Sequence, residues 1–507
     1  MPKHKNSLPT VSISNKKIIM LKSLEDNLKQ FEDIFQGDDS FMARHFACVR
    51  KNKSLKFCLL YLDGMVDAAI LDNSIIKPII NAHLPDDCEA NADIIINQVI
   101  FNHYAKKSQE SDELLSAIIM GDSVLLIENC YDAVIVSSKG WKSRTPSEPE
   151  GEKLIRGPRE GFVEPMLDNL ALIRRRLATP DLKYKEMTIG VETKTKIGIV
   201  YIEGIANKQI LAELIERINK VEIDGMVLAG SLAELIQDAP YSPFETIGFT
   251  ERPDVAVADL LEGRIIVLVD GTPITMTLPY LFEKFFQSGD DYSLNYLFSS
   301  FSRLLRMISF WLTITAPAIY VALTTYHQEM IPTALLMSIL AAREGVPFPT
   351  IVETVGLLVI FEILREAGTR MPISLSNALS ILGALVLGTA AVEAKIVSAT
   401  VIIVVALTGL TGLMTQRIKA PIVVIRTALT LLAGFMGLYG ILYGIIFVTL
   451  HMCSIRSFGV PYMMEFTSLN PGDLRDTALR APIWFLRHRP KLVSSSNKTR
   501  QANRLGQ

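Results

Sequence analysis

The chain lacks the motifs that identify the common classes of enzyme. Its 507 residues contain no P-loop, no GxGxxG turn, no HExxH helix and no GxSxG elbow. The seven histidines are scattered and show no metal-ligand spacing. A catalytic centre would have to be built from acidic residues in an unrecognised pocket. We therefore predict a protein that is not an enzyme and that has no cofactor and no metal site.

Cysteine and net charge are also low. The five cysteines show no CxxC spacing, and four of them lie in or beside apolar stretches. Such thiols are typical of the reduced core of a cytoplasmic domain. The formal net charge is −2, which gives no reason to predict a nucleic-acid partner. Residues 1–20 are basic and polar without an apolar core, so they predict a flexible leader and not a secretory signal.

Charged residues are missing from four long stretches in the second half of the chain. These stretches are residues 307–326, 371–392, 396–414 and 427–450. Each is close to the ~20 residues that a helix needs to cross the ~30 Å hydrocarbon core of a bilayer. Lipid offers the backbone no hydrogen bonds, so such segments must be helices. We predict a polytopic α-helical membrane domain over residues 301–453. Residues 330–342 are too short to cross, and they form either a re-entrant or interfacial segment or a solvated loop.

The first 300 residues instead alternate short strand-like runs with helical patterns. The clearest strand-like runs of the first part are residues 41–48, 55–62, 123–127 and 133–136. Residues 140–160, rich in Pro, Gly and charge, predict a linker between a first α/β subdomain (21–139) and a second one (161–300). The alternation favours an α/β fold with a mixed sheet. Residues 265–277 predict a hairpin, because Asp270-Gly271 suits a tight primed turn.

Basic residues give the orientation of the predicted membrane domain. Arg303 and Arg306, just before the first apolar run, are expected at the lipid headgroups, and the positive-inside rule then places the N-terminal region in the cytoplasm. The basic loop 416–426 and the basic tail, residues 454–507, should face the same side. However, residues 427–450 form a single crossing between them, which would place the two basic segments on opposite sides of the membrane. Either this glycine-rich helix breaks into a hairpin, or one of the basic segments breaks the rule.

Two glutamates interrupt a fifth apolar segment, residues 350–364. Intramembrane charges cost roughly 2.5–3.5 kcal/mol on insertion scales, so they usually face protein, water or a partner charge. Glu353 and Glu362 are nine residues apart, which places them on opposite faces of a helix and excludes a carboxylate pair. Glu362 lies three residues before Arg365, a spacing that permits an ion pair. Glu353 is a candidate for lining a channel or a subunit interface.

Small residues recur at four-residue spacing in the later apolar runs. Ser380, Ala384 and Gly388 form one such stripe, and Gly440 and Gly444 form another. Stripes of this kind let helix backbones approach closely in lipid. Two interpretations stay open for them, namely close helix packing and the lining of a narrow pore.

Several longer motifs occur in a fixed order along the chain. They are GPREGF at 157–162, ERPD at 251–254, EGRIIVLVDGTPITMTLP at 262–279, REGVPFP at 343–349, FEILREAG at 361–368 and ILGALVLGTAAVEA at 381–394. With these motifs the chain resembles the A subunit of the spore germinant receptors of endospore-forming bacteria. The resemblance covers roughly residues 155–490.

The resemblance implies a location in the spore inner membrane and assembly with two other subunits. These are a transporter-like B subunit, to which nutrient recognition is mainly attributed, and a lipoprotein C subunit. It also implies a homo-oligomeric ring of A subunits that conducts ions when nutrient binds. Our hypothesis is a non-enzymatic subunit of a nutrient-gated ion channel. The rival hypotheses are a secondary transporter, which predicts broken helices around a midplane site, and a membrane-anchored signalling scaffold.

One departure from the family pattern adds two candidate residues. Lys395 stands beside Glu393, where family members commonly have a small residue. The two side chains can pair with each other, or Lys395 can line a pore and alter its ion preference. The candidate pore or subunit-interface set is therefore Glu353, Ser380, Ala384, Gly388, Glu393 and Lys395, and the candidate ion pair is Glu362 with Arg365.

Overall fold

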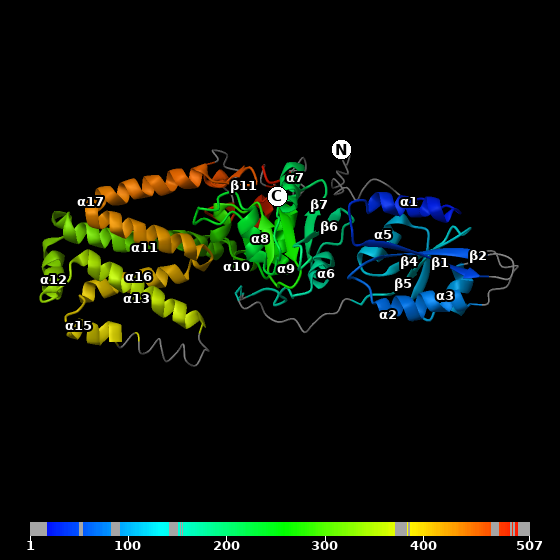
Figure 1. Cartoon of the computed structure of the whole chain (residues 1–507), viewed down its shortest axis with the longest axis horizontal. Coiled ribbons are helices and arrows are strands. Elements are labelled where there is room, and N and C mark those ends of the chain that lie inside the picture. The colour runs from blue at the N-terminus through cyan, green and yellow to red at the C-terminus, as the bar shows by residue number, and fades with distance from the viewer. Residues whose placement is uncertain are drawn as a thin grey trace, which may run out of the picture.

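The structure is a computed structural model with three bodies in a row (Figure 1). One α/β subdomain lies at one end, a second lies in the middle, and long helices form the other end. The described residues are 18–49, 54–82, 92–140, 151–152, 154, 156–370, 383, 386–467, 476–486, 489 and 492–494.

The first subdomain is a five-stranded sheet with helices on both faces. Its strands follow the order β1 (Phe41–Val49), β2 (Ser54–Leu62), β4 (Ser123–Ile127), β5 (Ala133–Val136) and β3 (Ala105–Ser108). One face packs against α1 (Leu24–Ile34) and α5 (Ser111–Ile119). The other packs against η1 (Leu71–Ile76), α3 (Lys77–Asn81) and η2 (Ile95–Val99), with the short helices α2 (Ala68–Ile70) and α4 (Ala92–Ile94) leading into η1 and η2.

Helix α1 shows how the sequence specifies these elements. Ser23 caps the helix by accepting a hydrogen bond from the backbone N–H of Asp26. Leu24, Leu28 and Phe31 recur at helical spacing and are all buried against the sheet. The apolar stripe of the helix therefore decides which face of the sheet it covers.

The second subdomain repeats the same topology. Its strand order is β6 (Leu182–Ile189), β7 (Thr195–Ile202), β9 (Ile265–Val269), β10 (Thr275–Leu278) and β8 (Gly248–Thr250). Helices α6 (Met166–Arg176) and α9 (Pro253–Glu262) pack on one face, and α7 (Lys208–Asn219) and α8 (Ala229–Ile236) on the other. The predicted hairpin is confirmed, because β9 and β10 pair antiparallel and Gly271 has φ of 83° in the turn between them.

The expectation of a mixed sheet is wrong. Every strand pair of the two five-stranded sheets, as far as the described residues define them, is antiparallel. In each subdomain two helical segments follow the second strand and carry the chain to the far edge of the sheet, where β3 or β8 enters. The next strand returns to the middle against its neighbours, so alternating helices and strands give an antiparallel sheet here.

A buried polar contact joins the two subdomains. Arg174 on α6 donates to the carboxylate of Asp38 at 2.7 Å and to the hydroxyl of Ser40 at 2.8 Å, and all three side chains are buried. Lys183 on β6 donates to the backbone carbonyl of Ile34 at 2.7 Å. Burial lowers the pKa of Lys183, and nearby carboxylates oppose this shift only in part. The loop after α1 is thus fixed against the edge of the second sheet.

Within the residues that the structure describes, the helical region contains five longer helices. They are α11 (Tyr296–Thr325), α12 (Thr333–Arg343), α13 (Thr350–Arg370), α16 (Ala399–Leu413) and α17 (Lys419–Ser454), with η5 (Val386–Ala390) and α15 (Ala391–Glu393) between α13 and α16. By length and composition, Tyr296–Thr325 and Gln416–Ser454 are long and apolar enough to cross a membrane. The segment predicted to be too short to cross forms α12, which is mostly exposed at the far end of this region (Figure 1).

Helix α17 is a hairpin of two halves. Gly437 has φ of 61° and ψ of −141°, which breaks the helix. In a straight helix, Leu429 and Gly444 would be about 22 Å apart. Instead, a methyl group added at Gly444 would overlap the side chain of Leu429, and one added at Gly440 would overlap the backbone of Leu432. The spaced glycines therefore let the two halves pack closely against each other.

Both ends of this hairpin return to the second subdomain. Arg417, just before α17, donates to the backbone carbonyl of Gln287 at 3.2 Å. His451, in the last turn, is 2.9 Å from the hydroxyl of Ser242. Of the two alternatives that the basic segments left open, the structure therefore shows the hairpin. The break lies at Gly437, in the turn between the two halves, and not within either half.

The described part of the C-terminal tail packs on the second subdomain. Strands β11 (Arg456–Ser457) and β12 (Val460–Pro461) pair with each other after α17. Phe458, Val460 and Val493 are buried in the core formed by α7, α8 and the second sheet. The tail therefore contributes to the fold of the second subdomain, a role that its basic composition did not predict.

Candidate functional site

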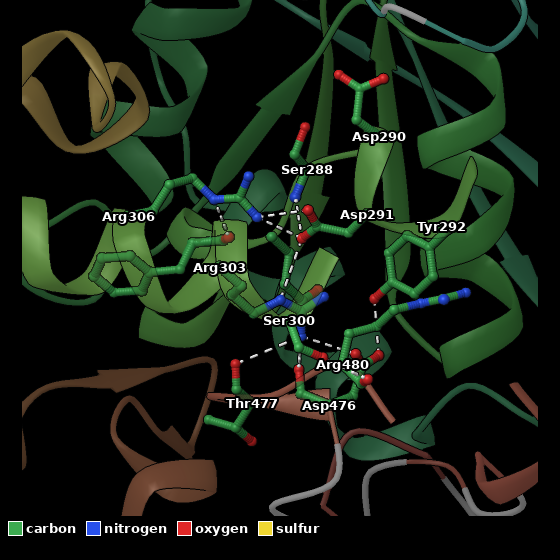
Figure 2. Close-up of polar contacts among 12 residues, drawn as sticks. Ser288, Asp290, Asp291, Tyr292, Ser300, Arg303, Arg306, Asp476, Thr477 and Arg480 are labelled. Carbon is green, nitrogen blue, oxygen red and sulfur yellow. Dashed lines mark hydrogen bonds and ion pairs between the residues drawn. The ribbon is translucent and has the colours of Figure 1, made fainter. Parts of the chain in front are cut away.

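An ionic cluster joins the second subdomain, the first long helix and the tail (Figure 2). Arg303, on the third turn of α11, is fully buried and donates to Asp291 at 3.2 Å and to Asp476 at 2.8 Å. Arg306 donates to the same Asp291 and, at 2.9 Å, to the backbone carbonyl of Phe286. The prediction that these arginines lie at lipid headgroups is wrong for Arg303, because Asp291, shortly before α11, and Asp476, from the tail, hold it inside the protein.

The tail completes this cluster, which we call the α11 junction (Asp291, Tyr292, Arg303, Arg306 and Asp476). The hydroxyl of Tyr292 donates to Asp476 at 2.8 Å. Burial raises the pKa of the Asp476 carboxyl, while Arg303 and Tyr292 favour its ionised form. Nearby, the hydroxyl of Ser300 donates to the backbone carbonyl of Arg480 at 2.9 Å. The α11 junction thus makes the start of α11 rigid with respect to the tail and the second subdomain.

A second buried cluster interacts electrostatically with Tyr292 and Asp476 of the junction. Lys284 bridges Asp259 at 2.9 Å and Glu262 at 2.7 Å, both on α9. Burial opposes the charge of Lys284, yet Asp259 and Glu262 together raise its pKa. Arg264 is fully buried beside the same carboxylates and donates to the backbone carbonyl of Pro279. Moving Tyr292 or Asp476 of the junction would therefore change the electrostatic surroundings of these buried charges.

Glu362 lies between two arginines in the helical region. It forms an ion pair with Arg365, at the predicted i, i+3 spacing, and with Arg426 on α17. Arg426 is almost fully buried, so Glu362 supplies its neutralising charge. This arrangement joins α13 to the first half of α17, before Gly437, and contributes to the packing of the helices.

Glu353 lies on the opposite face of α13 and is only 3% exposed. One carboxylate oxygen accepts a hydrogen bond from the backbone N–H of Ser398, at the start of α16. The hydroxyl of Ser398 is 3.2 Å from that of Thr400, which is 2.8 Å from the hydroxyl of Tyr320 on α11. Three helices therefore converge on one buried carboxylate and three hydroxyl groups.

Hydroxyl groups continue along the contact between α11 and α16. The hydroxyl oxygens of Thr313 and Thr411 are 2.8 Å apart, and each also lies within hydrogen-bond distance of a carbonyl of its own helix. With the Tyr320–Thr400 contact, they form a polar seam through an otherwise apolar helix pair. Such a seam can hold helices together or admit water and ions when the helices separate.

The remaining sequence-predicted residues do not gather around Glu353. Ser380 and Ala384 lie outside the described residues. Gly388 is exposed in η5, with open space around it. Glu393 and Lys395 are both exposed, no ion pair joins them within the described helical region, and Lys395 packs beside Gly345 in the turn after α12.

Several residues of these sites were not singled out from the sequence. Asp291 and Asp476 are polar residues in unremarkable segments, and the latter lies 173 positions from its partner Arg303. Tyr320 and Thr400 lie within apolar runs, where a hydroxyl is compatible with a membrane helix and does not stand out. The signal that could have identified Tyr320 and Thr400 is that each places a hydroxyl in an otherwise apolar helix, where a buried carboxylate such as Glu353 needs polar neighbours.

Comparison with known proteins places the chain in a family. The family model of the Bacillus/Clostridium GerA spore germination protein matches residues 29–492. The chain belongs to this family. Among its relatives, Spore germination protein KA of Bacillus subtilis (strain 168) is 37% identical over 96% of this chain and 89% of its own. Spore germination protein GerLA of Bacillus cereus is 32% identical over 94% of this chain and 98% of its own.

Two further similarities are to a membrane protein and to a domain of known structure. The Uncharacterized membrane protein YfkQ of Bacillus subtilis (strain 168) is 37% identical over 95% of this chain and 93% of its own. The crystal structure of the N-terminal domain of the A subunit of the Bacillus megaterium spore germinant receptor GerK3 is 30% identical, with a TM-score of 0.40 over 52% of this chain and 97% of that one.

Proposed function

We propose that this GerA-family protein is the A-type subunit of a nutrient germinant receptor in the spore inner membrane. Its helices cross the bilayer, and with further copies of the chain they form or complete an ion channel that opens when nutrient binds. A transporter-like B subunit and a lipoprotein C subunit are the expected partners. The protein carries out no catalysis, and its α/β region lies in the cytoplasm.

The observation that carries this proposal is the return of both ends of the helical region to the second subdomain. The start of α11 is held by the α11 junction, and the two ends of α17 contact Gln287 and Ser242. The halves of α17, residues 419–436 and 438–454, are each about 26 Å long at 1.5 Å per residue, close to the hydrocarbon thickness. Helices of this length with charged ends on one side fit a membrane bundle whose basic loops share the α/β side.

The geometry also suggests how nutrient binding reaches the pore. The α11 junction couples α11 to the second subdomain without flexible linkage, so movement of that subdomain moves α11. The polar seam between α11 and α16 would then open, widening an apolar constriction until water enters. The break in α17 lies at the hairpin turn, which gives no support to a transporter with a midplane site.

Ion flux through the purified receptor tests the proposal. The complex is reconstituted in vesicles, and release of monovalent cations is measured with and without candidate nutrients. Nutrient-dependent release without stoichiometric nutrient uptake supports a channel. Release coupled to uptake would show a transporter, and an electrically silent complex with every nutrient tried would leave only the scaffold.

Bulkier residues at the small-residue stripe sharpen this test. Gly388→Leu has space to fold, because nothing lies within 4 Å of an added Cβ. We expect it to change ion leak or germination rate if its exposed face lines a pore or meets a neighbouring subunit, and Ala384→Leu provides a second position on the stripe. If both variants assemble and germinate like the parent, the stripe has no part in conduction.

A further inference from the structure

Glu353 is a buried carboxylate with an incomplete set of protein partners. One oxygen accepts from the backbone N–H of Ser398, whereas no donor in the described part of the chain reaches Oε2. The side chain is 3% exposed, and Thr354 and Leu357 next to it on α13 are also buried. Buried carboxylates are normally paired with a positive charge or coordinate a metal ion.

The groups around Glu353 are oxygen atoms that can coordinate a cation. The hydroxyls of Ser398, Thr400 and Tyr320 form a chain of contacts of 3.2 and 2.8 Å. Glu353 is close enough to Tyr320 for the two to interact electrostatically. Each hydroxyl has oxygen lone pairs that it can offer when its hydrogen points elsewhere. Carboxylate and hydroxyl oxygens are hard ligands, which suit alkali and alkaline-earth cations and not softer metals.

The charge balance selects a monovalent ion. One carboxylate and three neutral hydroxyls compensate a single positive charge. Arg343, at the end of α12, also acts electrostatically on Tyr320, but it forms no ion pair with Glu353 within the described residues. We propose that Glu353, Ser398, Thr400 and Tyr320 bind one monovalent metal cation, Na⁺ or K⁺, where α11, α13 and α16 meet.

This inference deepens the proposed function, because it assigns the conducted class of ion a binding position inside the helical region. The site includes α11 and α16, the two helices that an opening of the polar seam must separate. A cation held there stabilises the closed bundle, and its departure accompanies opening. The site lies toward the end of the bundle that is remote from the α/β region, since α16 begins there and runs back toward Arg417.

Thermal unfolding of the purified full-length protein in detergent tests the site without any flux measurement. Tm is recorded in NaCl, in KCl and in N-methyl-glucamine chloride at equal ionic strength. We expect a rise of a few degrees that increases with the concentration of Na⁺ or K⁺, because the ligand binds only the folded state. Glu353→Gln should abolish this dependence, and Thr400→Val should raise the cation concentration needed for it several-fold.

Two controls make the outcome decisive. Glu366→Gln removes an exposed carboxylate from the same helix and should leave the cation dependence unchanged. If Glu353→Gln does not fold, Thr400→Val, which keeps the carboxylate, gives the answer. A parent protein whose Tm does not respond to Na⁺ or K⁺ overturns the site, as does Glu353→Gln with the parental response; a response that is absent in the parent and appears in Arg343→Gln assigns Glu353 to that arginine. A silent receptor with intact cation-dependent Tm would overturn the channel and leave the site standing.

Discussion

The two α/β subdomains share one topology but differ in where they bury charge. In the first subdomain, ion pairs such as Arg44–Asp72 and Lys107–Asp93 have side chains about half exposed. In the second, Arg264 and Lys284 lie in clusters hidden from water, and the α11 junction extends the buried charge into α11 and the tail. Two subdomains with the same fold can thus differ in role: the first lies at the end of the molecule, and the second holds the long helices in place.

The difference follows from what each sheet has to hold. The first sheet contacts the rest of the chain mainly through the loop after α1. The second receives α10 (Asp290–Ser293), α11, both ends of α17 and the tail. Directional, charge-assisted bonds fix such attachments in one geometry, whereas apolar packing alone would tolerate sliding.

The largest expected effect comes from breaking the α11 junction. Arg303→Met would leave Asp476, which is largely buried, without a cation and Asp291 with Arg306 alone. Breaking a buried ion pair in this way typically destabilises by about 3–5 kcal/mol. Arg44→Met, in an exposed pair of the first subdomain, should cost less than about 1 kcal/mol. Tm of the purified protein and germination of spores carrying each variant measure the two effects. Equal losses would show that buried charge does not distinguish the subdomains.

The contact between the subdomains should be nearly as sensitive. Arg174→Met leaves Asp38 buried and unpaired, and we expect a loss of about 3 kcal/mol with faster hydrogen exchange in the loop 35–40. Arg175→Met is the matched control, because its partner Glu160 is bonded by Arg176 as well and the pair is partly exposed. Unchanged exchange in Arg174→Met would mean that the subdomains are held by other contacts.

A smaller effect is expected at the hairpin that returns to the second subdomain. The Cβ of Gly440→Ala would overlap the backbone carbonyl of Leu432, so we expect a loss of about 1–3 kcal/mol. Gly356→Ala places the same methyl group on α13 with nothing within 4 Å, and it should be neutral or slightly stabilising. The Tm of the two variants decides. A neutral Gly440→Ala would contradict close packing of the two halves.

The smallest effect concerns pH at the subdomain contact. Burial lowers the folded-state pKa of Lys183 below its unfolded value, so the unfolded state binds the extra proton between the two values. Stability should therefore rise as pH increases from the folded-state pKa of Lys183 toward the unfolded value of roughly 10, and Lys183→Met should remove this rise. Lys185→Met, two residues further along β6, should keep the rise in stability with pH. Urea unfolding of each variant across this range gives the slopes, and identical slopes would exclude Lys183 as the cause.

Local patterns predicted much of the fold. The runs at 41–48, 55–62 and 265–277 correspond to strands because each combines apolar residues with a turn signal. The prediction of a mixed sheet was wrong because strand direction depends on where the connecting helices lead the chain. Hydrophobic periodicity and strand propensity do not encode that path. The repeat of the subdomains was also missed. Its clearest trace is the likeness of LKFCLLYLDG at 55–64 to TKIGIVYIEG at 195–204, where matched positions share hydrophobicity and few identities.

The candidate site was predictable only where its partners are close in sequence. Glu362 and Arg365 are one helical turn apart, so their spacing sufficed. Arg303 and Asp476, or Glu353 and Ser398, are brought together by tertiary packing alone. The uncharged runs showed which segments are apolar, and the basic segments left a hairpin open as one alternative for the last of them. The backbone of Gly437 and the contacts of Gly440 and Gly444 decide for two antiparallel halves.

The central claim is that the helical region crosses a bilayer and that its first and last residues both lie on the α/β side. Labelling single cysteines in sealed vesicles of known orientation, in a cysteine-free background, tests it most directly. Glu329→Cys lies in the exposed turn at the far end of α11, and Arg456→Cys lies just after α17. An impermeant maleimide added from the side opposite the α/β region should label Glu329→Cys at once and Arg456→Cys only after permeabilisation. Labelling of both positions from the same side would contradict the account.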